Sequence, residues 1–528
     1  MAASSLVAAG ILLSRLSGLV RESVFAHFFG VSLYADVFRA GLRMPNALQN
    51  LLGEGTLSAS FIPVYSELLE EGREEDAGRV AGAVFALLLA IAGFLALMGI
   101  LLAPVIVSVF LPGFSGEKRD LTIAVTRIIF PMTGILVLSA WALGILNSHR
   151  KFFVSYVAPV LWNGAMIGTM VFFGGGMDLP SLTRALAWGA LAGGALQFAI
   201  QIPWILRLEK NLRIRWDTRR KEVRETVRNA GPAVVGRGVV QISGYVDTFL
   251  ASFLFNGALA AIGFAQVLYM LPVSLFGMSV AAAELPELAR QRMGEAEQLR
   301  LRASKGLQRI AFYVVPSFVA FIALGDLMIS AIFERGRFEA GQTLLVHVIL
   351  MAFSIGLIAS TGTRLLSSTF FALRDTRTPA RYAVIRVAAA ATLAAVFMIQ
   401  FEPIEALGIP AGLFGGARIG GQPLGAVGLA AGSGMAAWIE WALLRRALRR
   451  RIGPVGAGAG ALARMFVAAI VAAAAGWGVR ILLPDIGAIL EAVAVFGTYG
   501  MVYFAVAAAL RLDEIHGVAT RVRRLLGR

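Results

Sequence analysis

The chain has 528 residues, of which 58% are hydrophobic and only 15% are charged, and its mean hydropathy is +0.75. This composition excludes an ordinary soluble globular protein and predicts a polytopic membrane protein. The net charge of +16 does not indicate nucleic-acid binding, because the basic residues are distributed over loops between apolar runs. The absence of cysteine excludes disulfides, and the four scattered histidines predict no metal cluster.

Apolar runs long enough to cross a bilayer core of about 30 Å recur along the whole chain. They predict an all-α protein with about fourteen transmembrane helices. The expected spans are residues 5–29, 33–62, 78–111, 121–147, 153–175, 182–206, 229–255, 258–287, 308–333, 341–372, 379–401, 422–447, 459–483 and 488–510. The first run lacks the basic start and small-residue cleavage site of a signal peptide, so we expect it to remain as a helix.

Basic residues predict the orientation of these helices. Most lysines and arginines fall in alternate loops, and the positive-inside rule places those loops and both termini in the cytoplasm. The resulting division is a six-helix half (1–206), a basic cytoplasmic linker (207–228), a second six-helix half (229–450), and two extra helices with a basic tail (451–528).

An internal repeat supports the two halves. The segment "SGLVRESVFAHFFG" at 17–30 is similar to "SGYVDTFLASFLFNG" at 243–257, and in both copies a proline follows on the next helix. Such repeats are typical of transporters, whose substrate site lies in a cavity between the halves. We therefore expect hinges at the paired positions Gly18 and Gly244, and Pro45 and Pro272.

Charged residues are concentrated in the first two expected helices. Six polar residues of the second helix are spaced by three or four and so share one face, and these are Asp36, Arg39, Arg43, Asn46, Asn50 and Glu54. Arg15 and Arg21 add two cations on the first helix. An arginine at the bilayer centre costs at least about 2.5 to 3.5 kcal/mol, so this stripe is expected to face water or substrate.

Two interpretations of the stripe remain open. The charges could neutralise one another, with Arg21 pairing with Glu22 or Asp36 and Arg43 pairing with Glu54. Alternatively, the surplus of arginine binds an anion in a cavity, since guanidinium groups match phosphate oxygens.

Several motifs carry a resemblance to a known family. They are "SRLSGLVRESVFAHFFG", "YADVFRAGLRMPN", "GEGTLSASFIPVYSE", "GPAVVGRGVVQISGYVDTFLASFL", "LPVSLFGMSVAAAELPELAR" and "LRDTRTPAR". Together they resemble the MurJ (MviN) family of lipid II flippases, within the multidrug/oligosaccharidyl-lipid/polysaccharide exporter superfamily. The resemblance implies a non-enzymatic transporter of the bacterial inner membrane. It would flip undecaprenyl-diphosphate-linked peptidoglycan precursor, and its two extra helices would form a groove for the lipid tail.

The resemblance also implies site residues. The matching positions are Arg15, Arg21, Asp36, Arg43 and Glu54.

The chain departs from the family at Gln49, where an arginine is expected, and at Gln266 and Val267, where a charged pair is expected. Either Arg39 and Arg237 compensate for the missing charges, or the cargo differs.

Other functions stay in view. A related exporter could move another lipid-linked oligosaccharide or a drug, although a cationic cavity disfavours cationic drugs. A membrane-embedded enzyme is not supported, because Asp178, Asp326 and Glu334 form no recognised catalytic motif.

The driving force is a separate question, centred on Asp247 in the expected seventh helix. The resemblance would make this carboxylate a sodium ligand, yet the expected helix 11 partners Ala390 and Ala394 offer no side-chain oxygen. One hypothesis is that Arg386 or Arg237 replaces the ion, so that transport is not coupled to sodium. The alternative is that backbone carbonyls and waters complete a sodium site. No other cofactor is expected, and the membrane potential is a further possible driving force.

Overall fold

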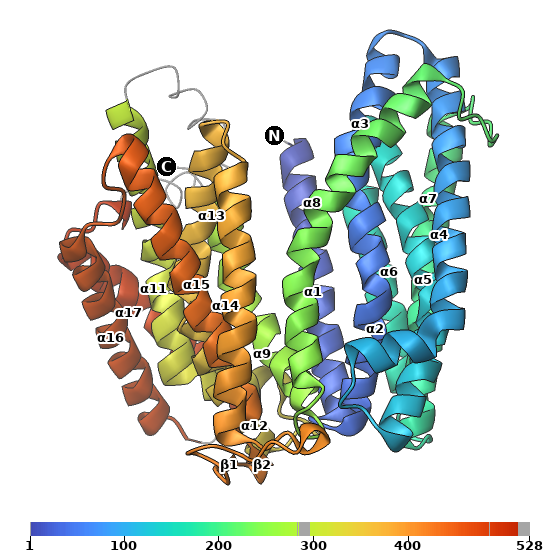
Figure 1. The fold of residues 1–528 in the computed structure, drawn as a ribbon. Helices are drawn as coiled ribbons and strands as arrows, with labels where there is room; N and C mark the ends of the chain where they lie inside the picture. The colour runs from blue at the N-terminus through green and yellow to red at the C-terminus, as the bar shows by residue number, and fades with distance from the viewer. Residues whose placement is uncertain (1, 282–283, 285–295, 485, 516–528) are drawn as a thin grey trace. The chain divides into compact units, whose positions relative to one another are not determined.

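The computed structural model describes residues 2–281, 284, 296–484 and 486–515, without the side chains of residues 2–9, 11, 235–237 and 239–243. This part of the chain is almost entirely helical (Figure 1), which confirms the all-α prediction. It divides into two compact units, residues 1–260 with 335–338 and residues 261–334 with 339–528.

The first unit is a helical bundle. Its helices are α1 (Ala2–Phe29), α2 (Leu33–Leu52), α3 (Glu54–Glu70), α4 (Glu74–Phe110), α5 (Gly116–Ser148), α6 (Phe152–Phe173), α7 (Leu179–Leu208) and α8 (Lys221–Ala251). Within the bundle α5 packs against α2, α4 and α7, and α6 packs against α1 and α7 (Figure 1). Ser32 begins α2 by accepting a hydrogen bond from the Ala35 N–H at 3.3 Å.

The expected span at 33–62 is interrupted. Pro45 lies inside α2 without ending it, and the break falls at Gly53, which separates α2 from α3. A Cβ at residue 53 would lie 2.3 Å from the carbonyl oxygen of Gln49, so only glycine fits there. The polar stripe predicted along one helix is therefore divided, with Glu54 on the first turn of α3.

The second unit contains most of α9 (Ala258–Pro272) and the helices that follow it. They are α11 (Ala296–Phe333), α12 (Ala340–Ser354), α13 (Leu357–Ala372), α14 (Arg377–Phe401), α15 (Gly425–Ile452), α16 (Ala459–Leu482) and α17 (Ala488–Ala509). A 3₁₀ turn η2 (Glu405–Leu407) and an antiparallel hairpin of β1 (Arg418–Ile419) and β2 (Gln422–Pro423) lie between α14 and α15. The last two helices pack on α11 through a core that includes Phe312, Met465 and Tyr503.

Small residues and one proline shape this unit. Gly428 and Gly432 of α15 allow α14 to approach so closely that a Cβ at residue 432 would lie 2.4 Å from the backbone nitrogen of Ala394. Ala394 is thus used for helix packing within its unit. After Pro272 the chain forms a π-helical turn, η1 (Val273–Met278), a backbone irregularity often found at functional sites.

Ten helices of the described residues are long and apolar enough to cross a membrane, and the bent pair α12 and α13 makes up to eleven. The expected count of fourteen is therefore not confirmed. Among the described helices, α1, α2 with α3, and α8 occupy the remaining expected spans. Of these helices, α2 is 20 residues long and carries three charged residues, Asp36, Arg39 and Arg43.

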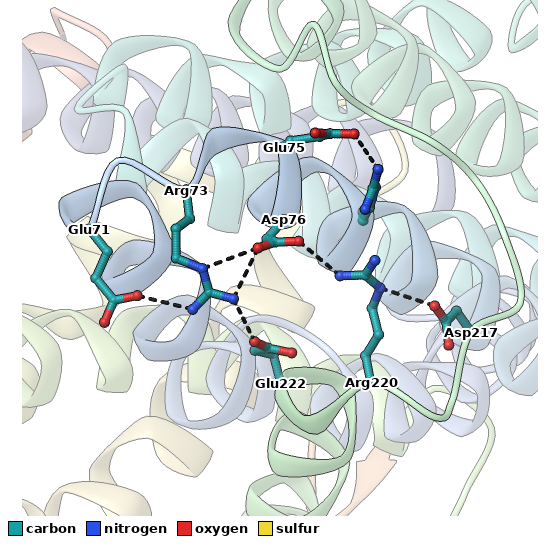
Figure 2. Close-up of polar contacts among 8 residues, drawn as sticks. Glu71, Arg73, Glu75, Asp76, Asp217, Arg220 and Glu222 are labelled. Atoms are coloured by element: carbon teal, nitrogen blue, oxygen red, sulfur yellow. Dashed lines mark hydrogen bonds and ion pairs between the residues drawn. The ribbon is translucent and has the colours of Figure 1, made fainter.

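The linker between α7 and α8 is fixed to the first unit. Its main chain crosses α4 at Gly78 and Gly82, where an added Cβ at residue 82 would lie 2.0 Å from the Arg213 carbonyl oxygen. Figure 2 shows the ion pairs that continue this contact, in which Arg73 binds three carboxylates and Arg220 binds two. The hydrogen bond to Glu71 is the largest of the contributions that raise the pKa of Arg73 above its usual range.

Candidate functional site

Two arginines of the first unit share one carboxylate. Glu22 on α1 accepts from Arg21 at 2.7 Å through one oxygen, and from Arg39 on α2 at 2.7 Å through the other. Arg21 also donates to the Asn163 side-chain oxygen at 3.0 Å and lies over the Trp162 ring, both on α6. These contacts fix both guanidinium groups in space.

This arrangement bears on the interpretation in which the charges of the stripe neutralise one another. Arg21 does pair with Glu22, as the neutralisation hypothesis expects, but the same carboxylate also serves Arg39. Two guanidinium groups therefore share this carboxylate. Each arginine has a side chain 17% exposed, so both guanidinium groups lie in a partly dry environment, where attraction between opposite charges is stronger than in water.

Asp36 has a structural role. Its carboxylate is 1% exposed and binds the Lys118 ammonium at 2.7 Å, and Lys118 on α5 is itself only 7% exposed. The same carboxylate accepts from the backbone N–H groups of Gly257 and Ala260, both at 2.8 Å. Asp36 therefore joins α2 to α5 and caps the start of α9. It does not pair with Arg21.

Arg43 contacts α8 instead of Glu54. Its guanidinium faces Gly244 so closely that a Cβ there would lie 2.6 Å from one nitrogen, and its carbonyl oxygen accepts from the Tyr245 hydroxyl at 3.3 Å. Asp247 interacts electrostatically with the same guanidinium. Because of this close approach, Gly244 has a packing role in addition to the hinge role predicted from the repeat.

Glu54 lines a polar cavity of about 580 Å³ inside the first unit. The side chain is exposed at the start of α3, and Gln49 and Asn50 at the end of α2 line the same space. Gln49 is the position where the family is expected to carry an arginine, so a neutral amide stands in this cavity.

The second unit contains a comparable group around Glu440 on α15. This carboxylate is 5% exposed and forms an ion pair with Arg386 on α14 at 3.5 Å. Arg364 on α13 interacts electrostatically with both. Within its unit Arg386 is therefore the partner of Glu440, which the sequence did not predict.

The other predicted residues are placed as follows. Arg15 is exposed on α1, and Gly18 lies beside the Asn163 amide, 3.9 Å from a Cβ position. Gln266 and Val267 are half-buried on α9. Arg237 belongs to α8, but its side chain lies outside the described residues.

The sequence analysis missed Glu22 as a shared partner, Lys118, Asn163 and Glu440. A signal existed for Lys118, because it precedes the fourth expected span on the same predicted side of the membrane as Asp36. No comparable sequence signal identified Asn163. Among the described residues, no group of three His, Asp or Glu side chains could hold a metal ion.

Comparison with known proteins agrees with this architecture. The family model described as "Lipid II flippase MurJ" matches residues 25–495. A probable lipid II flippase MurJ of Rhizobium tropici is 33% identical over 382 residues, which cover 71% of each chain. The lipid II flippase MurJ of Burkholderia cenocepacia is 30% identical over 380 residues, covering 71% of this chain and 73% of the relative.

Solved structures show the same fold. A lipid II flippase MurJ in an inward closed conformation has a TM-score of 0.76 at 22% identity, covering 96% of this chain and 99% of that one. An inward-facing multidrug resistance transporter of the MATE family has a TM-score of 0.61 at 18% identity, covering 83% and 96%.

Proposed function

Because the chain belongs to the lipid II flippase MurJ family, we propose that it moves lipid II, the undecaprenyl-diphosphate-linked peptidoglycan precursor, from the inner to the outer leaflet. The chain is a multi-pass protein of the bacterial inner membrane and not an enzyme. Its role is then in peptidoglycan biosynthesis, cell wall biogenesis and cell shape. The basic linker and loops support an orientation with both termini in the cytoplasm.

The observation that carries this proposal is the pair of arginines held by one carboxylate. Arg21 and Arg39 are fixed by Glu22 and by residues of α6, and so they are preorganised before any ligand arrives. A diphosphate carries negative charge and several acceptor oxygens, which match two guanidinium forks. In this proposal Arg43 adds a third cation on α2, and the cargo is anionic, unlike a cationic drug.

Alternating access is proposed as the transport cycle, with hinges at Gly18, Pro45, Gly244 and Pro272. The π-helical turn directly after Pro272 supports a hinge there, because a helix with irregular hydrogen bonding bends more easily. Spectroscopic distances between labels on α2 and α9, measured with and without lipid II, should show two populations. A single unchanged distance would contradict the cycle.

The proposal predicts loss of function without loss of folding. Arg21→Ala and Arg39→Ala each remove a charge-assisted contact worth about 1.5 to 3 kcal/mol. Each variant should insert normally in the membrane and fail to complement a flippase-depleted strain. Arg127→Ala is the matched control, since Arg127 is an exposed arginine of α5 that donates to the backbone carbonyl of Ile100.

Native mass spectrometry identifies the cargo directly. Purified protein should retain lipid II, and the arginine variants should lose it. If the variants complement fully and retain the lipid, the arginines are structural. Retention of a different lipid-linked oligosaccharide would instead indicate the alternative cargo.

A further inference from the structure

The polar cavity of the first unit is lined mainly by uncharged side chains. It is lined by residues of α2, α3, α5, α6 and α7, and its volume of about 580 Å³ lies in the range of small-molecule sites. The polar side chains that line it are Gln49, Asn50, Glu54, Ser58, Ser139 and Gln197. Small and apolar residues such as Gly55, Ala59 and Ala140 complete the wall.

The lining favours an uncharged polar ligand. Among the described residues that line the cavity there is no lysine or arginine, so phosphate has no cationic partner in it. Amides and hydroxyls both donate and accept hydrogen bonds, and the Glu54 carboxylate accepts them. Sugar hydroxyls, which also donate and accept, fit such a surface.

Part of the lining is held in place from behind. The Ser139 hydroxyl donates to Gln201 at 2.9 Å and accepts from the Gln197 amide at 3.2 Å. Gln201 is fully buried, and in the described part of the chain its amide nitrogen has no hydrogen-bond partner. This chain of side chains orients Gln197 along the wall of the cavity.

The cavity also lies within reach of Arg43, the third cation of the proposed diphosphate site. Asn50 follows Arg43 by seven residues, which places it on the same face of α2 and about 10 Å further along the helix. A sugar bonded directly to a diphosphate lies within that reach. Along α2 the polar stripe therefore carries guanidinium groups first and amides further on. This order matches that of the diphosphate and the sugar in the lipid.

We propose that this cavity binds the uncharged saccharide of a diphosphate-linked lipid while the arginines bind its diphosphate. The inference rests on the proposed function and specifies which part of the head group the first unit recognises. Gln49 and Gln197 donate to and accept from sugar hydroxyls, and Glu54 accepts from them. The neutral Gln49 is then a specificity residue.

The test compares two lipids that differ only in the head group. Binding of undecaprenyl diphosphate and of lipid II is titrated by native mass spectrometry on the full-length protein. Gln49→Leu removes hydrogen-bonding groups, and Ala59→Phe fills the cavity from an exposed position of α3. We expect lipid II to bind roughly three- to tenfold more weakly to Gln49→Leu, and undecaprenyl diphosphate to bind unchanged.

Ala90→Phe is the matched control for the filling variant. Ala90 is an exposed alanine of α4 that does not line this cavity, so its substitution should leave both lipids bound as in the wild type. If Ala59→Phe fails to fold, Gln49→Leu still tests the inference.

Each outcome has one meaning. Equal binding of both lipids to the wild type, or an equal loss of both in Gln49→Leu, overturns the saccharide site and leaves the flippase function standing. Failure of the wild type to bind either lipid overturns the proposed function itself. Weaker binding of lipid II alone supports the site.

Discussion

The pair of Asp36 and Lys118 offers a sharp test of how the first unit is held together. Asp36 is 1% exposed and Lys118 is 7% exposed, and they lie 2.7 Å apart. Lys118→Met removes the ammonium but keeps an apolar side chain of similar length, so packing changes little. The substitution removes the ion pair with Asp36 together with the hydrogen bond that the ammonium donates to the Asn256 side-chain oxygen at 3.1 Å.

The expected magnitude follows from the partners that remain. Removing one member of a buried ion pair costs about 3 to 5 kcal/mol. In Lys118→Met the Asp36 carboxylate keeps the N–H groups of Gly257 and Ala260, both at 2.8 Å, which continue to stabilise its charge. We therefore expect a loss near the lower end, about 3 kcal/mol in the free energy of unfolding.

A double-mutant cycle completes the argument. Asp36→Asn leaves the Lys118 ammonium buried without a counter-charge, whereas Asp36→Asn with Lys118→Met leaves neither charge. The loss of unfolding free energy in the double variant should be smaller than the sum of the two single losses by at least about 1.5 kcal/mol. Denaturant and thermal unfolding in detergent micelles measure all four proteins.

Lys210→Met is the control, because Lys210 is an exposed lysine of the same unit and its loss should change stability by less than about 0.5 kcal/mol. A loss below about 1 kcal/mol in Lys118→Met, or simple additivity in the cycle, would refute the buried link.

Three further predictions concern the linker, a loop carboxylate and the driving force. Gly82→Ala should displace the linker from α4, because the new Cβ would clash with the linker main chain, and tryptic cleavage of the linker should increase. Gly93→Ala on the same helix is the control, because its Cβ meets no atom within 4 Å and cleavage should not increase. Hydrogen bonds from Thr378 lower the pKa of Asp375 in the folded protein to about 2, whereas its pKa in the unfolded chain is about 4. The ionised carboxylate therefore stabilises the folded protein at neutral pH. Asp375→Asn should lower Tm at pH 7, and this difference in Tm should vanish as the pH falls towards 2. Because Asp247 already interacts with a guanidinium, flipping in proteoliposomes should persist when choline replaces sodium; sodium dependence that disappears in Asp247→Asn would contradict this.

The membrane-spanning architecture was determined largely by the sequence. Hydropathy is a local property, and an apolar run in a bilayer must form a helix to satisfy its backbone hydrogen bonds. The expected ranges 78–111 and 488–510 differ little from α4 and α17 for this reason. The period of 3.6 likewise predicted that Arg39 and Arg43 share a face of α2.

The sequence predicted less well where several helices meet. It treated residues 33–62 as one helix, whereas the backbone breaks at Gly53, and its count of fourteen spans is not confirmed by the ten or eleven apolar spans of the described residues. A break depends on the exact carbonyl that a glycine approaches, and this is set by packing as well as by composition.

Only the tertiary structure decided which charges meet. Asp36 binds Lys118 where the sequence offered Arg21, and Arg43 interacts with Asp247 on α8 where the sequence offered Glu54. Arg39, for which the sequence offered no partner, binds Glu22. In a low-dielectric bundle a buried charge is costly until it is paired, and the partner that it finds depends on which helix faces bring the two groups within a few ångströms. The sequence predicted a stripe of charged residues, and helix packing decided that Glu22 holds Arg21 and Arg39 together.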